Sequence, residues 1–336
     1  MKAVVCEAFG GPEVLHLRDL PDPPPPGPGE VQVRIRARGV QYVDVLMLAG
    51  KYQFRPEPPF VPGNEGAGEV VAVGAGVERF KPGDRVMSRH RLGAFAERGN
   101  ALAENCNPVP AGMSIEEAAV FSGAYHTAYH ALLQRGRLKA GDWVLIHGAA
   151  GGIGIAAIQV AKLFGATVIA TASTEEKRRA CLEEGADYAI DYRDGFRDKV
   201  KELTGAHDGV DIVYDPIGAG VTDESLRCLA YGGRLLVLGF LGGGPAMPRT
   251  NYLLIKCLEV IGVRLGAVTE HWPEVGRDNM RKLVELAGEA KLRPRISHRF
   301  PLECAGEAIQ AVIDRKVIGK AQLTCGLCCG GGRGTC

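Results

Sequence analysis

The chain between about residue 123 and residue 267 alternates between apolar runs and helix-like runs, and this alternation constrains the fold more than any other feature. "DWVLIHG" (142–148) is a continuous apolar run that ends at glycines and leads into the helical pattern "IGIAAIQVAKLFG" (153–165). The alternation continues with strands at 167–172, 187–191, 210–215 and 234–240, and with helices at 175–184, 196–204 and 222–230. Such alternation indicates βαβ units, and continuous apolar strands indicate a sheet covered on both faces. We therefore predict an α/β fold with a doubly wound parallel sheet.

The glycine-rich stretch "HGAAGGIG" (147–154) joins the first of these strands to its helix. In that position Gly151 would let backbone N–H groups approach a pyrophosphate, and Gly154 would let the helix pack closely on the strand. The helix N-terminus adds unpaired donors and a partial positive charge. The pattern predicts a Rossmann-type dinucleotide site, although the loop could also only turn a corner. The residues expected around the pyrophosphate are Ala150, Gly151, Gly152 and Ile153.

Ser173 stands at the end of the second strand, nineteen positions after Gly154. NAD enzymes usually have a carboxylate near this position, which binds the ribose hydroxyls and repels a 2′-phosphate. A short hydroxyl residue removes that repulsion, and Lys177 can make a charge-assisted contact to the phosphate. We therefore expect NADPH as the cofactor. The alternative is that Lys177, Arg178 and Arg179 form a solvated helix face paired with nearby glutamates.

The first 122 residues have a different composition, with short strands, turns and prolines. "EVQVRIRARGV" (30–40) alternates apolar and polar residues as a half-buried strand does, and "LPDPPPPGPGE" (20–30) reads as an extended loop. Residues 268–324 contain two helical and two strand patterns, which is too little chain to bury a core alone. We predict a β-rich domain from 1–122 and 268–324, a nucleotide domain from 123–267, and a tail from 325–336.

Composition and charge exclude several classes of function. The formal net charge is +1, which gives no field that attracts nucleic acid or an anionic membrane. No apolar run reaches the ~18 residues of a membrane-spanning helix, and "MKAVVCEAF" lacks a signal-peptide pattern. We expect a cytoplasmic protein whose scattered single cysteines are reduced core residues.

The tail "TCGLCCGGGRGTC" (324–336) contains Cys325, Cys328, Cys329 and Cys336. A Cys-x-x-Cys motif can hold a metal or form disulfides, but a glycine run cannot bury a core. We favour a disordered tail, or sequence that is not native to the protein, over a metal site.

Four stretches carry a resemblance to a known family: "VPGNEGAGEVVAVG" (61–74), "FKPGDRV" (80–86), "GDWVLIHGAAGGIGIAAIQVAK" (141–162) and "VDIVYDP" (210–216). With them the chain, up to about residue 324, resembles the zinc-free NADPH:quinone oxidoreductase (ζ-crystallin-like) family of the medium-chain dehydrogenase/reductase superfamily. The resemblance implies a GroES-like β-rich catalytic domain that the C-terminal segment completes. It also implies a homodimer formed through an edge strand, "CLEVIGVRLGA" (257–267).

The positions that bind zinc in the alcohol dehydrogenases of this superfamily hold Gln41 and Asn64 in this chain. Neutral amides are poor zinc ligands compared with thiolate and imidazole, so we predict no metal, although Asp44 and Glu65 remain. His126 and His130 share a helical spacing but have no identifiable third ligand, so we expect them in the core or in a polar network. Without a Lewis acid, the acceptor must already be activated by conjugation.

The resemblance also implies the place of each group in a cleft between the domains. Gln41 and Asn64 would hydrogen-bond the oxygens of a quinone, and Tyr52 would be a proton donor, an aromatic wall or only a packing residue. Thr127 would contact the nicotinamide carboxamide, and Tyr192 would lie near the adenosine phosphate. The complete set of expected cofactor-binding residues is Thr127, Ala150, Gly151, Gly152, Ile153, Ser173, Lys177, Tyr192, Gly239, Phe240 and Lys320.

Three functions remain open at this point. The first is NADPH-dependent reduction of quinones by direct hydride transfer without zinc. The second is NADPH-dependent reduction of the C=C bond of an enone or enoyl thioester, which adds a proton at carbon. The third is an NADPH-binding protein that is crystallin-like or binds RNA, although the near-neutral charge argues against nucleic acid.

Overall fold

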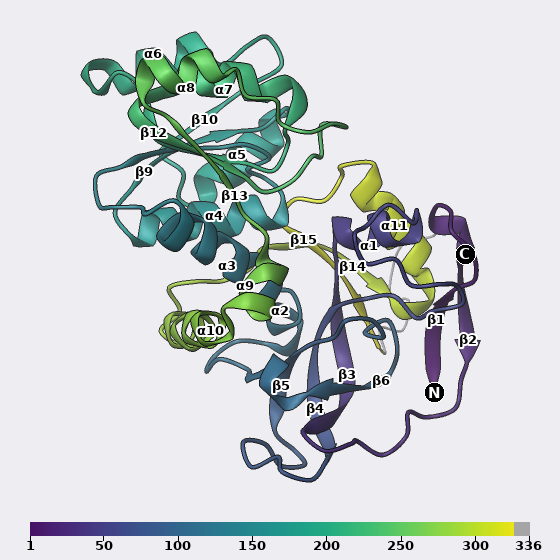
Figure 1. Ribbon diagram of the computed structural model, residues 1–336. Helices are drawn as coiled ribbons and strands as arrows, with labels where there is room; N and C mark the ends of the chain where they lie inside the picture. Colours follow the sequence, from purple (N-terminus) through teal and green to yellow (C-terminus); the bar gives the residue numbers. More distant parts are fainter. Residues whose placement is uncertain (326–336) are drawn as a thin grey trace. The chain divides into compact units, whose positions relative to one another are not determined.

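The computed structural model describes residues 1–325, and the chain divides into two compact units (Figure 1). Unit 1 contains Met1–Gly123 and the chain from Val284 onward, and unit 2 contains Ala124–Leu283. The second division falls inside helix α10 (Pro273–Gly288), whereas the sequence suggested residue 268. The first half of α10 belongs to unit 2 because Asn279 hydrogen-bonds His126 and Gln134 there.

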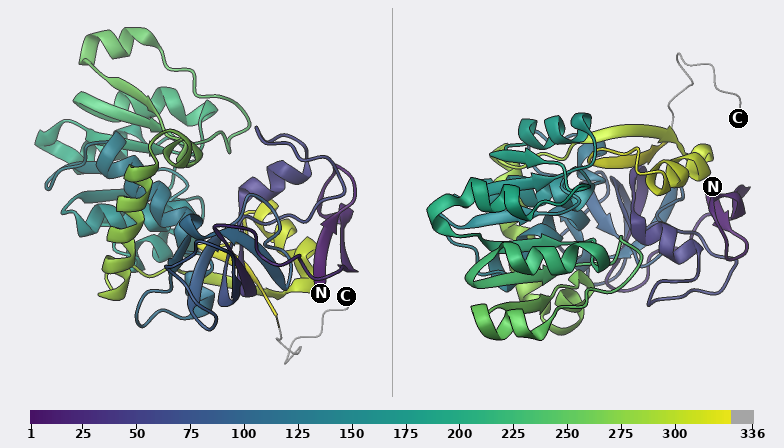
Figure 2. Two further views of the ribbon diagram at one scale, coloured as in Figure 1. Left: turned by 60° about the horizontal axis from the view of Figure 1, so that its bottom comes forward. Right: turned by 90° about the horizontal axis from the view of Figure 1, so that it is seen from above.

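Unit 2 contains a six-stranded sheet in the order β10-β9-β8-β11-β12-β13, and every neighbouring pair is parallel. Its strands are β8 (Trp143–Ile146), β9 (Thr167–Thr171), β10 (Tyr188–Ile190), β11 (Val210–Asp215), β12 (Leu229–Val237) and β13 (Glu259–Gly262). Helix α4 (Gly152–Leu163) lies on one face, and α6 (Arg197–Thr204) and α7 (Thr222–Cys228) lie on the other (Figures 1 and 2). The doubly wound parallel sheet is confirmed.

The remaining helices of unit 2 are α3 (Ser122–Tyr129, starting at the end of unit 1), α5 (Glu175–Glu183), α8 (Thr250–Lys256) and α9 (Leu265–His271). The sheet is buried on both faces, and the central side chains of Leu145, Ile169 and Val213 are inaccessible to solvent. That burial explains why the strand patterns were readable as continuous apolar runs.

The predicted edge strand 257–267 is wrong in its length. Cys257 has a left-handed backbone (φ +52°) that ends α8, so strand β13 begins only at Glu259. It ends at Gly262, because Arg264 already precedes α9. Strand β12 likewise begins at Leu229, where the sequence suggested the end of a helix. The edge position itself is as expected, since β13 pairs only with β12.

Unit 1 contains a seven-stranded sheet in the order β14-β15-β3-β4-β5-β7, with β6 also paired to β3, and a separate β1–β2 hairpin. Its strands are β1 (Lys2–Cys6), β2 (Leu15–Asp19), β3 (Glu30–Val40), β4 (Glu65–Val73), β5 (Arg85–Arg89), β6 (Arg98–Leu102), β7 (Cys106–Pro108), β14 (Ile296–Pro301) and β15 (Lys320–Thr324). Its helices are α1 (Tyr42–Leu48), α2 (Ile115–Ala118) and α11 (Ala305–Ile313).

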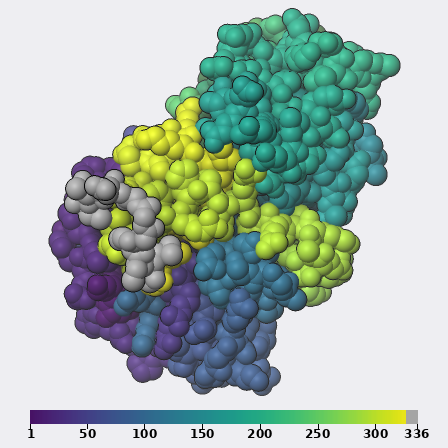
Figure 3. Space-filling view, turned by 180° about the vertical axis from the view of Figure 1, so that it is seen from behind, coloured from purple at the N-terminus to yellow at the C-terminus, as the bar shows by residue number. Residues whose placement is uncertain are grey.

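The C-terminal segment completes the first domain, as predicted. Strand β15 lies between β14 and β3 and pairs antiparallel with β3. Buried residues from both ends of the chain, including Val4, Leu48 and Leu323, form one hydrophobic cluster. In the space-filling view the yellow C-terminal residues of this unit lie against the purple N-terminal ones (Figure 3).

Two further findings concern the described part of the chain. No helix within residues 1–325 is both long enough and apolar enough to cross a membrane. The cysteines there are free, and four of them are buried (Cys6, Cys106, Cys181 and Cys228). The tail cysteines Cys328, Cys329 and Cys336 lie outside the described residues.

Candidate active site

The glycine-rich loop of unit 2 fits a phosphate group. Gly151 immediately precedes α4, and the backbone N–H groups of the first turn, beginning at Gly152, face the loop without intrahelical partners. A Cβ on Gly154 would lie 2.5 Å from the carbonyl oxygens of Gly148 and Ala149, so only glycine allows the helix to start this close. Gly151, Gly152 and Ile153 are half-buried at this helix start, and Ala150 is buried.

Beneath the loop lies His147, which the sequence analysis did not single out. Its Nδ1 is 3.0 Å from Oγ1 of Thr171 and its Nε2 is 2.8 Å from Oγ of Ser225. Complete burial lowers the pKa of His147 to about 3, so the ring is neutral. The imidazole therefore links β8, β9 and α7 under the loop without adding charge. The only signal in the sequence was a histidine between an apolar strand and a glycine.

Ser173 and Lys177 lie together after strand β9, and both are half-buried. Thr174 begins α5, because its Oγ1 accepts a hydrogen bond from the Lys177 N–H at 3.3 Å. Arg179 is exposed and lies 3.8 Å from Glu183, so the solvated-face alternative holds for that residue.

Another carboxylate at this edge of the sheet belongs to Asp191, which follows the neighbouring strand β10. Arg178 donates to it at 2.9 Å and Arg193 at 2.6 Å, and hydrogen bonds from Arg193 hold the pKa of Asp191 well below its usual range. Arg178 also donates to the carbonyl oxygen of Ala172 at 3.2 Å, which places its guanidinium next to Ser173 in the chain. Tyr192, the next residue, is half-buried at the same edge.

The ends of β11 and β12 bring further predicted residues to this edge of the sheet. Asp215 is buried and accepts N–H groups from Ile217 at 2.8 Å and from Gly218 at 2.9 Å, and burial raises its pKa. Gly239 is half-buried after β12, and the Phe240 side chain is 53% exposed. Thr127 lies elsewhere in unit 2, on α3, and is half-buried.

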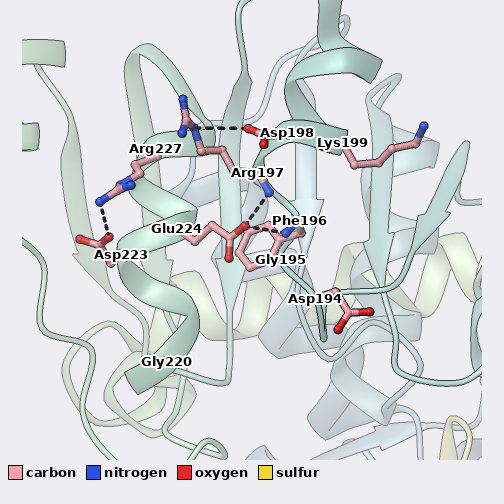
Figure 4. Close-up of a pocket in the computed structure, with 10 residues that line it drawn as sticks. All are labelled: Asp194, Gly195, Phe196, Arg197, Asp198, Lys199, Gly220, Asp223, Glu224 and Arg227. Carbon is pink, nitrogen blue, oxygen red and sulfur yellow. Dashed lines mark hydrogen bonds and ion pairs between the residues drawn. The ribbon is translucent and has the colours of Figure 1, made fainter.

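A pocket of about 470 Å³ opens in unit 2 between the start of α6 and the first turns of α7 (Figure 4). Its charged groups largely satisfy one another: Glu224 accepts the backbone N–H of Arg197 at 2.7 Å, and Arg227 lies 3.0 Å from Asp223. Four acidic and three basic side chains line it, so the pocket does not favour a phosphate. We assign it no role.

In unit 1 the predicted catalytic amides are in direct contact. Gln41 donates from Nε2 to Oδ1 of Asn64 at 3.0 Å. The backbone N–H of Gln41 donates to Oδ2 of Asp44 at 2.8 Å, which fixes Gln41 at the start of α1. The contact therefore orients both amides and leaves the Nδ2 group of Asn64 as a donor.

Glu65 and Lys320 form a buried ion pair behind these amides. The Nζ of Lys320 is 2.8 Å from Oε1 of Glu65, and the Gly123 N–H donates to Oε2 at 3.1 Å. Both side chains are at most 8% exposed. A Cβ on Gly39 or on Gly123 would collide with the Glu65 carboxylate, at 2.3 and 2.8 Å, so two glycines make room for it. Lys320 was expected to contact the cofactor, and its ammonium group is bonded to Glu65 in unit 1.

Two more titratable groups lie around the amides. Asp44 is fully buried, and burial raises its pKa to about 7, with the charge of Glu65 acting in the same direction and Lys320 opposing it. Tyr52 is half-buried in the coil after α1 and lies within electrostatic range of the Arg89 guanidinium. Its hydroxyl makes no hydrogen bond with the amide pair in the described chain.

The side chains at the superfamily's zinc position do not fit zinc. Gln41 and Asn64 are neutral amides that bond to each other, and the oxygens of Glu65 already accept from Lys320 and Gly123. Among residues 1–325, no group of three histidine, cysteine or acidic side chains could hold a metal ion. We therefore derive no chemical step through a metal.

The two α3-region histidines belong to a polar network, as expected. His126 lies 3.3 Å from Nδ2 of Asn279, and His130 is hydrogen-bonded to Gln134. Gln134 in turn donates to Asn279 at 2.6 Å.

Two protein-family models match this chain, one over each half of residues 27–280. The family described as "Alcohol dehydrogenase GroES-like domain" matches residues 27–152, and the family described as "Zinc-binding dehydrogenase" matches residues 152–280. "Quinone oxidoreductase-like protein 2 homolog" of Nematostella vectensis is 36% identical, covering 96% of this chain and 88% of that protein. Human "Quinone oxidoreductase" is 34% identical, covering 93% and 94%.

Solved structures agree with these relatives. The Escherichia coli quinone oxidoreductase complexed with NADPH superposes with a TM-score of 0.89 at 31% identity, covering 96% of this chain and all of that one. A probable oxidoreductase from Mycobacterium abscessus gives a TM-score of 0.88 at 39% identity, covering 96% and 99%. The chain belongs to the quinone oxidoreductase family of the medium-chain dehydrogenase/reductase superfamily and is an oxidoreductase.

Proposed function

We propose that the protein reduces quinones with NADPH by direct hydride transfer, without zinc. The observation that carries this proposal is the hydrogen bond between Gln41 and Asn64 at the superfamily's metal position. Two amides in contact can bind an acceptor oxygen but cannot polarise an unactivated ketone as a metal does. An acceptor activated by conjugation suits such a site.

The preference for NADPH is supported by the charges around Ser173. The residue offers a hydroxyl in place of a carboxylate, Lys177 lies one helical turn away, and Arg178 donates to the carbonyl of the preceding Ala172. A 2′-phosphate would gain charge-assisted hydrogen bonds there. The E. coli relative was solved with NADPH, which agrees with this choice.

Each part of the site then has a defined task. The first turn of α4 binds the pyrophosphate, and the residues after β9 and β10 bind the adenosine end. The bound cofactor supplies the hydride. Gln41 and Asn64 orient the acceptor, and the free N–H groups of Asn64 Nδ2 stabilise the oxygen on which charge develops. The assignments of Thr127, Gly239, Phe240 and Lys320 to the cofactor stay predictions.

Reduction of a conjugated C=C bond is the second candidate. It requires a proton at carbon after hydride addition, and the Tyr52 hydroxyl next to Arg89 is a group that can supply one. The two candidates share the cofactor and differ in whether the final proton goes to oxygen or to carbon.

We also propose a homodimer that pairs through strand β13. The strand has one unpaired edge, and apolar side chains are exposed around it: Val260 at 36%, Ile255 at 67% and Leu254 at 82%. An unpaired edge beside exposed apolar groups favours pairing with a second copy. Sedimentation of wild type and of Val260→Lys tests this, and a monomeric wild type at micromolar concentration contradicts it. The cytoplasmic location stays a prediction.

A substrate panel tests the activity. The purified protein is assayed with NADPH or NADH against 1,4-benzoquinones, enals and an enoyl thioester. Turnover of quinones with NADPH supports the proposal, and turnover of the enals or thioester alone supports the second candidate. Tight NADPH binding with no turnover of any acceptor would favour a crystallin-like or RNA-binding protein.

A further inference from the structure

Arg89 is a half-buried arginine at the end of strand β5 with no polar partner. It stands directly opposite Glu65 in the β4–β5 register, so both side chains lie on the same face of the sheet. Within residues 1–325, its guanidinium group makes no hydrogen bond and no ion pair. Glu65 is already bonded to Lys320 and Gly123, and no ion pair joins it to Arg89.

No guanidinium nitrogen of Arg89 is among the fully buried atoms that lack a partner in the described chain, so its donors are open to water or to a ligand. A guanidinium has five N–H donors, and polar groups withdrawn from water are normally hydrogen-bonded. The fully buried Arg38 follows that rule, since it donates to three backbone carbonyls and to the Cys325 sulfur. Arg91, two residues along the chain, has its charge 3.8 Å above the ring of Phe54. Unlike Arg38, Arg89 therefore has guanidinium donors that no described protein group accepts.

The surroundings of Arg89 connect it to the acceptor site. Its charge interacts with that of Glu65, which follows Asn64 in the chain, and Tyr52 lies within electrostatic range of it. Burial lowers the pKa of Arg89, and these two neighbours oppose that effect, but an arginine stays protonated at any working pH. A permanent cation with unused donors thus stands opposite Glu65, the residue that follows Asn64 of the amide pair.

We propose that Arg89 is a catalytic residue that binds the acceptor oxygen as negative charge develops on it. This inference rests on the proposed function and names the group that takes the electrostatic place of a metal. The acceptor gains a hydride, and one electron pair of its conjugated system moves onto the oxygen. The guanidinium donates hydrogen bonds to that oxygen until a proton from water neutralises it. The acceptor is reduced by two electrons, and the nicotinamide is oxidised by two.

The test compares Arg89→Met, Arg89→Lys and a matched control, Arg91→Met, with the wild type. Loss of one donor to a developing oxyanion lowers kcat by about 10²- to 10³-fold, so we expect at least a tenfold fall in kcat for Arg89→Met with 1,4-benzoquinone. Arg89→Lys should retain part of the activity, and Arg91→Met should stay within twofold. Because the Arg89 guanidinium makes no hydrogen bond within residues 1–325, the unfolding midpoint of Arg89→Met should not fall, and its KM for NADPH should be unchanged.

The outcomes separate this inference from the proposed function. A wild type that reduces no quinone overturns both. An active wild type with a kcat for Arg89→Met within threefold of its own overturns the role of Arg89 alone. An effect confined to the KM of quinones that carry a carboxylate would also overturn it, because Arg89 would then bind a fixed anion. A lowered unfolding midpoint that accounts for the lost activity would show a structural role.

Discussion

Substitution of Lys320 by methionine should strongly destabilise unit 1. Lys320 and Glu65 are 8% and 2% exposed, and their charged atoms are 2.8 Å apart. Removing the cation leaves the Glu65 carboxylate buried with only the Gly123 N–H as a donor. Breaking a buried pair from one side costs about 3–5 kcal/mol of unfolding free energy.

The double variant Glu65→Gln with Lys320→Met distinguishes the stability cost of a buried unpaired charge from the cost of lost side-chain packing. A glutamine can still accept the Gly123 N–H, and no charge remains buried. Replacing both partners of a buried pair by neutral groups is often close to neutral in stability, so we expect the double variant within about 2 kcal/mol of wild type. Lys316→Met is the surface control, since its pair with Asp314 lies at the surface and contributes little to stability.

The assay must report on unit 1 by itself. Both tryptophans, Trp143 and Trp272, lie in unit 2, so fluorescence follows that unit only. Hydrogen exchange of peptides covering β4 and β15 reports on unit 1. A loss of about 3–5 kcal/mol should accelerate exchange there by roughly 10²-fold to several thousandfold, since about 1.4 kcal/mol corresponds to tenfold.

Two results would refute the reasoning. One is exchange in Lys320→Met that differs from wild type by less than tenfold. The other is a double variant as unstable as the single one, which would show that lost packing, and not an uncompensated charge, causes the effect.

Three further predictions concern other parts of the molecule. Ser173→Asp should raise the KM for NADPH at least tenfold in steady-state assays, because the new carboxylate repels the 2′-phosphate, and should leave the KM for NADH nearly unchanged. An equal rise in the KM values of NADPH and NADH would contradict this prediction. Asp44→Asn should remove a pH dependence of the unfolding free energy. The pKa of Asp44 in the folded protein is about 7, above the ordinary 3.8, so the protonated carboxyl stabilises the fold at low pH. This contribution is lost as the pH rises from about 4 to about 7. Urea unfolding at pH 5 and pH 8 measures it, and a wild type with no loss at pH 8 relative to the variant would be inconsistent. Gly154→Ala should lower the unfolding midpoint measured by tryptophan fluorescence and weaken NADPH binding, because the alanine Cβ would lie 2.5 Å from backbone oxygens. An unfolding midpoint and an NADPH affinity equal to those of wild type would exclude this close approach of helix and loop.

Local patterns were sufficient for most of unit 2. Strands β8 and β11 are buried on both faces, so their apolar runs identified them directly. The start of the edge strand β13 was harder to predict, because the left-handed backbone of Cys257, which ends α8, leaves no clear signal in the sequence. A non-glycine residue at such a position is uncommon, which is why the strand was predicted to begin too early.

The site was predictable only where residue type alone carries the chemistry. Gln41 and Asn64 were found because amides stand where metal ligands were expected. The partner of Lys320 could not be found, because Glu65 is 255 residues away in the sequence. The lack of a partner for Arg89 depends on every neighbour in the fold, and no local pattern reports it.

The most direct test of the central claim is a single-turnover experiment in the presence of a metal chelator. The protein is mixed with one equivalent of NADPH and excess 1,4-benzoquinone, and the absorbance of the reduced nicotinamide is followed, with and without deuterium at the transferred position. Direct hydride transfer without a metal predicts a decay that the chelator does not slow and that deuterium slows as a primary isotope effect. A decay that chelation abolishes, or one that proceeds only with NADH, would contradict it.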